Sequence, residues 1–139
     1  MKKKQKRSGK SKKKNLGKFK SAIEKYCSDS LKSAKIPFDY EEKEFVLMDK
    51  FRFENKYFKM TAKKKDMSDR YTPDFVSKDG SLIIETNGYL PSHHDFPMRW
   101  KLFLRYIMDN ELNYDVYLAK NRQQVDQAIS EIKKSMGNG

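Results

Sequence analysis

Two carboxylates at the ends of neighbouring predicted strands are the residues best suited to chemistry in this sequence. Asp74 lies in the segment Tyr71–Phe75, and Glu85 closes the apolar run that begins at Leu82. A tight hairpin between the two strands would let both side chains converge, where they would repel each other and shift each other's pKa. A hard divalent cation removes that conflict because it prefers oxygen ligands. Such an ion also activates a bound water toward a phosphodiester.

The residues that follow Glu85 extend this candidate site. Period-two strand geometry places Glu85 and Asn87 on one face and the side chain of Thr86 on the other. The backbone carbonyl of Thr86 is then available as a further ligand. The sequence therefore predicts a site for Mg²⁺ or Mn²⁺ formed by Asp74, Glu85 and the Thr86 carbonyl. A purely structural interpretation stays open, because Pro-Asp at a strand start and Glu near a strand end are both common.

Positive charge is concentrated at the N-terminus of the chain. The net charge is +12, and residues 1–20 contain eleven Lys and Arg and no acidic residue. We expect residues 1–18 to form a disordered basic tail that binds a polyanion such as DNA, because neutralised phosphates release counterions. A solubilising tail and a patch for an anionic membrane are the alternatives. The basic residues expected to contact phosphate are Lys10, Lys12, Lys13, Lys14, Lys18, Lys20, Lys63, Lys64, Lys65 and Arg70.

Composition limits the class of protein. With 139 residues, 37% of them hydrophobic, the chain is long enough for one packed domain, expected at 19–139. It contains no apolar run of the roughly 18 residues that span a bilayer and no apolar segment after the basic N-terminus. Its one cysteine, Cys27, is expected to be a small buried hydrophobe, and the setting a reducing cytoplasm. His93 and His94 are expected to be exposed.

Hydrophobic periodicity predicts elements that would position the two carboxylates. Helical spacing covers 19–34, 96–111 and 122–136, with Trp100 on the apolar face of the second helix. Strands are predicted at Tyr71–Ser77, Ser81–Asn87 and Asp115–Ala119, with Asp79-Gly80 as a hairpin turn. Phe38–Met48 and Phe51–Ala62 are predicted to be two aromatic-rich extended stretches. This order of elements indicates an α/β fold in which helices cover a sheet.

These segments resemble a known nuclease motif. Pro73-Asp74 followed by Glu85-Thr86-Asn87 resembles the PD-(D/E)xK motif of metal-dependent nucleases. Within that superfamily the chain most resembles the phage endonuclease I family of Holliday-junction resolvases. Four short stretches carry the likeness in the same order, at 19–24, 35–42, 71–75 and 84–88.

The resemblance implies a fold, an activity and roles for residues. It implies a restriction-endonuclease-like α/β core, with a mixed central sheet flanked by helices, in an intertwined homodimer bridged by the ribbon 38–62. Asp74 and Glu85 would be metal ligands, and Glu24 on the first helix would complete the catalytic acidic cluster. The implied activity is structure-selective cleavage of branched DNA with Mg²⁺ or Mn²⁺, in a phage-infected bacterial cell.

The chain departs from this family at two points. Asn87 stands where the motif has a lysine, and asparagine can hydrogen-bond a water but carries no charge. The change could be inactivating, tolerated, or compensated by a lysine elsewhere such as Lys101. The segment between Glu42 and Tyr71 is also longer than the family's. A sequence-biased nicking or homing endonuclease and a catalytically impaired branched-DNA-binding protein are therefore the alternative functions.

Overall fold

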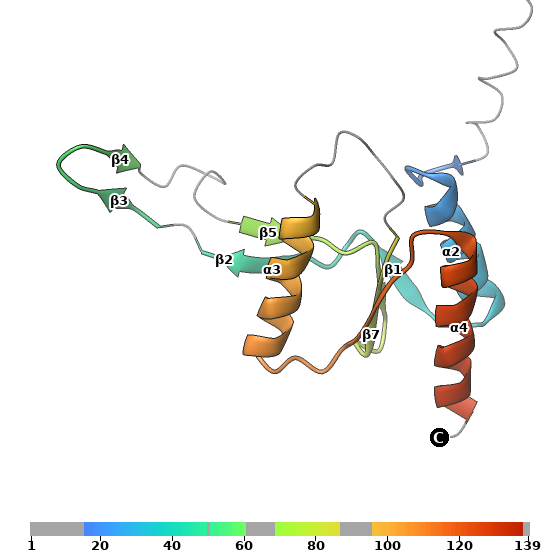
Figure 1. Cartoon of the computed structure of the whole chain (residues 1–139). Coiled ribbons are helices and arrows are strands. Elements are labelled where there is room, and N and C mark those ends of the chain that lie inside the picture. Colours follow the sequence, from blue (N-terminus) through green and yellow to red (C-terminus); the bar gives the residue numbers. More distant parts are fainter. Residues whose placement is uncertain (1–15, 50, 61–68, 87–95, 138–139) are drawn as a thin grey trace, which may run out of the picture. The chain divides into compact units, whose positions relative to one another are not determined.

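The computed structural model describes residues 16–49, 51–60, 69–86 and 96–137. Within these ranges the protein has three α-helices and eight short strands, so it belongs to the α/β class, as the order of predicted elements indicated (Figure 1). The helices are α2 (Ala22–Ser33), α3 (Phe96–Asp109) and α4 (Arg122–Gly137). The strands are β1 (Phe38–Tyr40), β2 (Phe45–Met48), β3 (Phe53–Glu54), β4 (Lys59–Met60), β5 (Asp69–Tyr71), β6 (Phe75–Ser77), β7 (Leu82–Glu85) and β8 (Asp115–Leu118).

The chain divides into two compact units. The first, here called the helical unit, comprises Met1–Ile36, Thr86–Gly88 and Leu118–Gly139. The second, the sheet unit, comprises Pro37–Glu85 and Tyr89–Tyr117. Among the described helices, none is both long enough and apolar enough to cross a membrane.

Helix α2 has well-defined caps at both ends. Ser21 is the N-cap, and its Oγ accepts a hydrogen bond from the Glu24 N–H over 3.2 Å. At the other end Lys35 adopts a left-handed conformation with φ 59°, and the Ile36 N–H donates to the Leu31 carbonyl over 3.0 Å. This pattern is a Schellman motif, which satisfies the last carbonyls of the helix. The predicted start at residue 19 was therefore three residues early, because Ser21 caps the helix.

Helices α2 and α4 pack against each other in the helical unit. Cys27 and Leu31 of α2 are buried, as are Val125, Ala128, Ile129 and Ile132 of α4. The Tyr26 hydroxyl donates to Asp126 Oδ1 over 2.6 Å, which ties the two helices at their surface. The predictions of a helix at 122–136 and of a buried Cys27 are confirmed.

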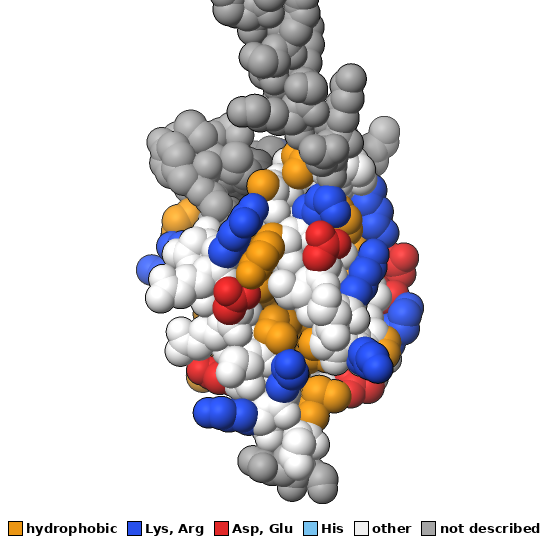
Figure 2. Space-filling view, turned by 90° about the vertical axis from the view of Figure 1, so that its right-hand side faces the viewer, with side chains coloured by type: hydrophobic (Ala, Val, Ile, Leu, Met, Phe, Trp, Pro, Cys, Tyr) orange, Lys and Arg blue, Asp and Glu red, His pale blue; other side chains and the backbone are white. Residues whose placement is uncertain are grey.

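The outer side of this helix pair carries an open groove. The groove has a volume of about 700 Å³, and its lining includes Tyr26, Asp29, Asp126 and Lys133. Figure 2 shows this side of the helical unit, where Lys and Arg side chains flank a strip of hydrophobic ones. Both signs of charge line the groove, so its electrostatics favour no single class of ligand.

The main sheet has four strands in the order β1-β6-β7-β8. Strand β6 is antiparallel to both β1 and β7, and β8 joins beside β7 to complete a mixed sheet. The turn between β6 and β7 contains Gly80 at φ 72°, a backbone conformation that glycine adopts without strain. All four residues of β7 are buried. The predicted hairpin at Asp79-Gly80 and the doubly buried strand are confirmed.

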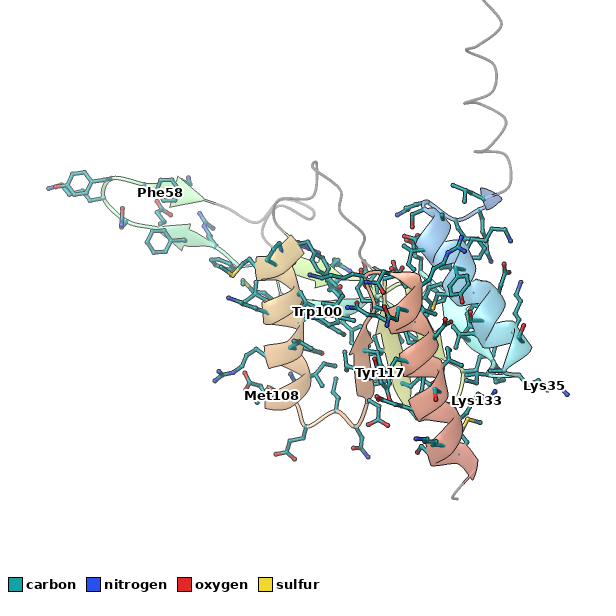
Figure 3. All side chains as sticks on the ribbon, turned by 45° about the vertical axis from the view of Figure 1, so that its right-hand side comes forward. Lys35, Phe58, Trp100, Met108, Tyr117 and Lys133 are labelled. Carbon is teal, nitrogen blue, oxygen red and sulfur yellow. The ribbon has the colours of Figure 1, made fainter. Side chains whose placement is uncertain are left out.

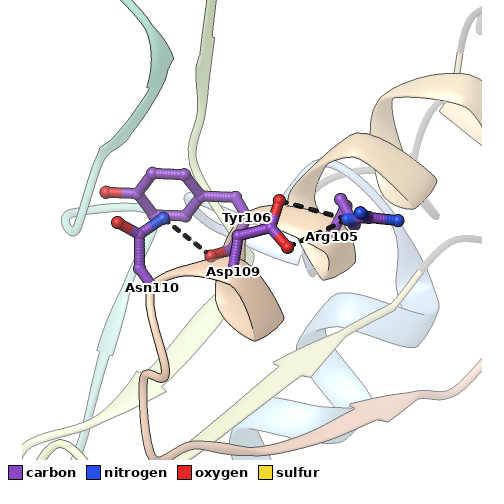
Figure 4. A network of polar contacts seen from close by, with 4 residues as sticks. All are labelled: Arg105, Tyr106, Asp109 and Asn110. Carbon is purple, nitrogen blue, oxygen red and sulfur yellow. Dashed lines mark hydrogen bonds and ion pairs between the residues drawn. The ribbon is translucent and has the colours of Figure 1, made fainter.

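Helix α3 covers an aromatic core in the sheet unit. Phe45, Tyr71 and Phe103 lie at its centre, with Tyr71 and Phe103 stacked at 4.5 Å between ring centroids. Trp100 packs against the same cluster, which confirms its assignment to the helix core (Figure 3). At the C-terminal end of α3, Arg105 pairs with Asp109 over 2.9 Å and Asn110 Nδ2 donates to the Tyr106 carbonyl (Figure 4).

Two predicted extended stretches are interrupted in the structure. The stretch 38–48 breaks after β1 at Glu41, so β1 joins the main sheet whereas β2 pairs with β5. The described part of 51–62 folds back on itself as the hairpin β3–β4, because the side chain of Asn55 caps a turn. The strand predicted at 71–77 is likewise two strands, β5 and β6, separated at Pro73, which has no N–H to donate to a ladder.

Candidate metal centre

Asp74 and Glu85 lie together at one end of the β6–β7 hairpin. The register pairs Phe75 with Ile84, so Asp74 stands across from Glu85. The Asp74 N–H donates a hydrogen bond to Glu85 Oε1 over 3.1 Å. The residues are only 6% and 9% exposed. The convergence expected from the sequence is therefore present, in an environment where a carboxylate loses much of its hydration.

Glu41 adds a carboxylate that the sequence did not single out. It follows β1, and the pairing of Tyr40 with Phe75 brings it next to Asp74. The Glu41 N–H donates to the Asp74 carbonyl over 2.8 Å, and carboxylate oxygens of the two residues lie within 4.8 Å of each other. Two half-buried or buried carboxylates at this separation suit a shared divalent cation.

The backbone at Glu41 is strained. Its φ is 50°, in the left-handed region that costs a non-glycine residue roughly 1–2 kcal/mol. Such strain persists where the surrounding structure holds it, and it is concentrated at functional sites. The only sequence signal was the pair Glu41-Glu42 directly after an aromatic strand, which by itself is a common surface pattern.

Tyr71 brings a buried hydroxyl to the same place. The side chain is 5% exposed, and among the described residues its hydroxyl has no hydrogen-bond partner in suitable geometry. Burial raises the pKa of Tyr71 strongly, and the carboxylates of Glu85 and Asp74 raise it further. The hydroxyl therefore stays protonated and is available to donate. A buried donor without a well-formed hydrogen bond is costly, and this one interacts with the carboxylates of Glu85 and Asp74.

Arg99 is the cation next to this tyrosine. Its guanidinium lies 5.8 Å from the centroid of the Tyr71 ring and lowers the pKa of the hydroxyl, against the larger opposing effects. Arg99 also donates to Asp69 Oδ1 over 2.9 Å and to the carbonyl of Arg70. These contacts place its charge at the start of β5.

Glu24 lies in the first turn of α2, in the helical unit, and is 7% exposed. Its Oε1 accepts a hydrogen bond from the Lys20 N–H over 3.0 Å, while its own N–H donates to Ser21. This arrangement is a variant of the capping box, in which Glu24 bonds the N–H of Lys20 instead of that of the N-cap Ser21; the spacing Ser21-x-x-Glu24 could have predicted a cap here. By their chemistry Glu24, Glu41 and Asp74 are three carboxylates that could hold a metal ion.

The other predicted site residues have different outcomes. Thr86 is buried at 4% exposure directly after β7. Asn87, His93, His94 and the basic residues at positions 10–14 and 63–65 lie outside the described residues. Lys18, Lys20 and Lys101 are exposed. Arg70 is exposed too, and its Nη1 pairs with Glu44 over 3.0 Å, which reduces its charge available for phosphate.

Searches of protein-family models, curated proteins and solved structures found no match. The chemistry of the site must therefore be inferred from its own residues. Carboxylate oxygens, the buried Tyr71 hydroxyl and the backbone carbonyl of Thr86, which follows Glu85, fit a hard divalent cation with coordinated waters.

Proposed function

We propose that this protein is a metal-dependent DNA endonuclease that hydrolyses phosphodiesters near branch points, with Mg²⁺ or Mn²⁺ as cofactor. One observation carries the proposal: the carboxylates of Asp74 and Glu41 lie within 4.8 Å of each other, and the Asp74 N–H holds the Glu85 carboxylate at the same strand ends, beside the buried Tyr71 hydroxyl. The basic residues at 1–20 supply affinity for a polyanion. The resemblance to phage endonuclease I supplies the preference for branched DNA.

The side chains have separate roles in the proposed reaction. Asp74 and Glu41 would hold the cation, and Glu85 is oriented by the bond from the Asp74 N–H. A bound divalent ion lowers the pKa of a coordinated water and stabilises charge on the phosphate. In the hydrolysis a water oxygen would form a bond to phosphorus while the bond from phosphorus to the leaving deoxyribose oxygen breaks; a carboxylate such as Glu85 would accept the proton of the water, and the leaving oxygen would take a proton from solvent. The protonated Tyr71 donates a hydrogen bond to this water or to the phosphate.

Glu24 completes the acidic set in this proposal, and the Thr86 carbonyl adds a further ligand. Support for Glu24 comes from the resemblance and from its burial on α2. The resemblance also implies an intertwined homodimer, in which Glu24 of one protomer serves Asp74 of the other. Mixing Glu24→Gln protein with Asp74→Asn protein tests this arrangement. Exchange of subunits would restore one intact site if the residues act across protomers, and none if they act within one.

A second candidate function follows from Asn87. A motif that lacks its lysine has lost a charge that stabilises the attacked phosphate, so the protein would bind branched DNA with little or no cleavage. This alternative keeps the same cation site and the same basic tail. It differs from the first candidate in turnover alone.

Cleavage of a synthetic four-way junction, compared with a linear duplex of the same sequence, tests the proposal. With Mg²⁺ or Mn²⁺ we expect the wild-type chain to cut the junction preferentially. Asp74→Asn should lower the rate by more than about 100-fold, since even residues that only support metal ligands are worth 10–100-fold. The matched control is Asp109→Asn, an exposed carboxylate on α3 that should leave the rate unchanged.

Each other outcome has a definite meaning. Equal cutting of junction and duplex would contradict branch selectivity, and site-dependent cutting of duplex would indicate a sequence-biased nicking enzyme. Tight junction binding without cutting would support the second candidate. Cleavage by Asp74→Asn at the wild-type rate would contradict the metal centre itself.

A further inference from the structure

The hairpin β3–β4 exposes aromatic side chains that the proposed chemistry does not use. We call residues 51–60 the aromatic hairpin. Phe51, Phe53 and Phe58 are about half exposed, at 49%, 46% and 55%, and Tyr57 is 86% exposed. Figure 3 shows Phe58 on this hairpin. Clustered exposed apolar surface of this kind marks an interaction site.

Hydrogen bonds in the turn order the backbone that carries these rings. Asn55 Oδ1 accepts hydrogen bonds from the N–H groups of Tyr57 and Phe58, over 2.9 and 2.8 Å. The Asn55 N–H in turn donates to the Phe58 carbonyl over 2.8 Å. The rings of Phe53 and Phe58 lie 6.1 Å apart between centroids. A partner that stacks on these rings therefore meets a backbone that is already ordered, which lowers the entropic cost of binding.

The charges of the aromatic hairpin indicate the chemical class of its partner. Arg52, Lys56 and Lys59 are its cations, and its single acid, Glu54, is paired with Arg52 over 3.6 Å. The ammonium of Lys56 lies 5.5 Å from the centroid of the Tyr57 ring. A partner that suits these groups has flat apolar faces and regularly placed negative charges. Unpaired nucleotides have both features.

We propose that the aromatic hairpin binds unpaired bases at a DNA branch point. Tyr57 and Phe58 stack on the bases, and Lys56 and Lys59 contact the flanking phosphates. The inference rests on the proposed nuclease function, for which it supplies a means of recognising branches. It differs from the role expected for residues 38–62 as a bridge between protomers, because it assigns the exposed rings to DNA.

The test is binding of the full-length protein, in EDTA, to a junction that carries 2-aminopurine at an unpaired branch nucleotide, with a fully paired duplex as the second ligand. Tyr57→Ala/Phe58→Ala should bind the junction about tenfold more weakly or worse, since each stacked base contributes that order of affinity. Its affinity for duplex should stay within about twofold. Tyr57→Phe keeps a ring and should keep junction affinity. Met108→Ala, an exposed apolar residue on α3, is the matched control.

The outcomes separate this inference from the proposed function. Junction cleavage by the wild-type chain, together with unchanged junction affinity of Tyr57→Ala/Phe58→Ala, would overturn the inference and leave the nuclease proposal standing. Loss of junction affinity in that variant, with no cleavage by the wild-type chain in Mn²⁺, would support the inference alone. Light scattering without DNA gives a further outcome. A lower mass for Tyr57→Ala/Phe58→Ala than for the wild-type chain, with unchanged DNA affinity, would show that the rings contact a second copy of the chain and would overturn the inference.

Discussion

The backbone N–H of Asp74 donates a hydrogen bond to the carboxylate of Glu85 over 3.1 Å at the buried end of the β6–β7 hairpin. This bond orients the side chain of Glu85, and its donor belongs to Asp74, the second acidic residue of the pair. Glu85 is therefore held toward Asp74 before any ion binds. Preorganisation of this kind is what a metal centre needs from its supporting strands.

The helix-capping role of Glu24 can be separated from its proposed role in metal binding. Ser21→Ala should lower the free energy of unfolding by about 1 kcal/mol, because it removes the N-cap, and should leave Mn²⁺ affinity unchanged. Glu24→Gln keeps an oxygen for the capping box and should cost less stability, yet weaken Mn²⁺ binding. Urea unfolding and calorimetry measure the two effects. Unchanged Mn²⁺ affinity in Glu24→Gln would make Glu24 a capping residue alone.

Tyr71→Phe should stabilise the protein when no metal is bound. The substitution removes a buried hydroxyl that makes no hydrogen bond of good geometry to any described residue, and relief of that desolvation cost should add about 1 kcal/mol to the free energy of unfolding in EDTA. Tyr57→Phe, at an exposed position, is the control and should have little effect. Destabilisation of Tyr71→Phe by a similar amount would show instead that the hydroxyl makes a stabilising hydrogen bond.

Stability at alkaline pH should depend on Tyr71. Burial raises the pKa of Tyr71 in the folded state well above its usual value, whereas an unfolded tyrosine ionises near pH 10. Above about pH 10 the unfolded state therefore binds fewer protons than the folded state, so stability falls as pH rises. The wild-type chain should lose up to about 1.4 kcal/mol per pH unit more than Tyr71→Phe. If the free energy of unfolding fell equally with pH in the two proteins above about pH 10, the raised pKa of Tyr71 would be refuted.

Asn87→Lys should raise the rate of junction cleavage. The added ammonium supplies the charge that the motif lacks, which we expect to be worth at least about tenfold in rate. Asn113→Lys adds the same charge at an exposed position outside the motif and controls for general affinity toward DNA. An unchanged rate in Asn87→Lys would indicate that another lysine already supplies this charge. The cleavage rate of Lys101→Ala would then test whether that lysine is Lys101 on α3.

The helices and the central hairpin could be predicted because local signals define them. The apolar spacing from Val125 to Ile132 and the turn at Asp79-Gly80 each specify an element within a short window. The convergence of Asp74 and Glu85 followed from that turn. Cap residues shifted the boundaries, since Ser21 starts α2 later than the apolar pattern alone suggests.

Glu41 could not be predicted because its position depends on a long-range pairing. Strand β1 reaches Asp74 through its register with β6, some 35 residues further along the chain. The left-handed backbone at Glu41 leaves no mark in the sequence, where Asn or Gly would be the usual signal. The turn at Asn55 was not predicted either, for a local reason. The Asn55 side chain accepts hydrogen bonds from the backbone two and three residues further on, and these bonds compete with an extended strand.

The most direct test of the account is Mn²⁺ binding by two variants at adjacent positions. Glu41 lies beside Asp74, whereas its neighbour Glu42 is exposed, so Glu41→Gln and Glu42→Gln differ only in which carboxylate is lost. In calorimetric titrations we expect Glu41→Gln to bind Mn²⁺ more weakly than the wild-type chain by about tenfold or more, and Glu42→Gln to bind like wild type. Equal Mn²⁺ affinity in all three proteins would contradict a metal centre formed by Glu41 and Asp74.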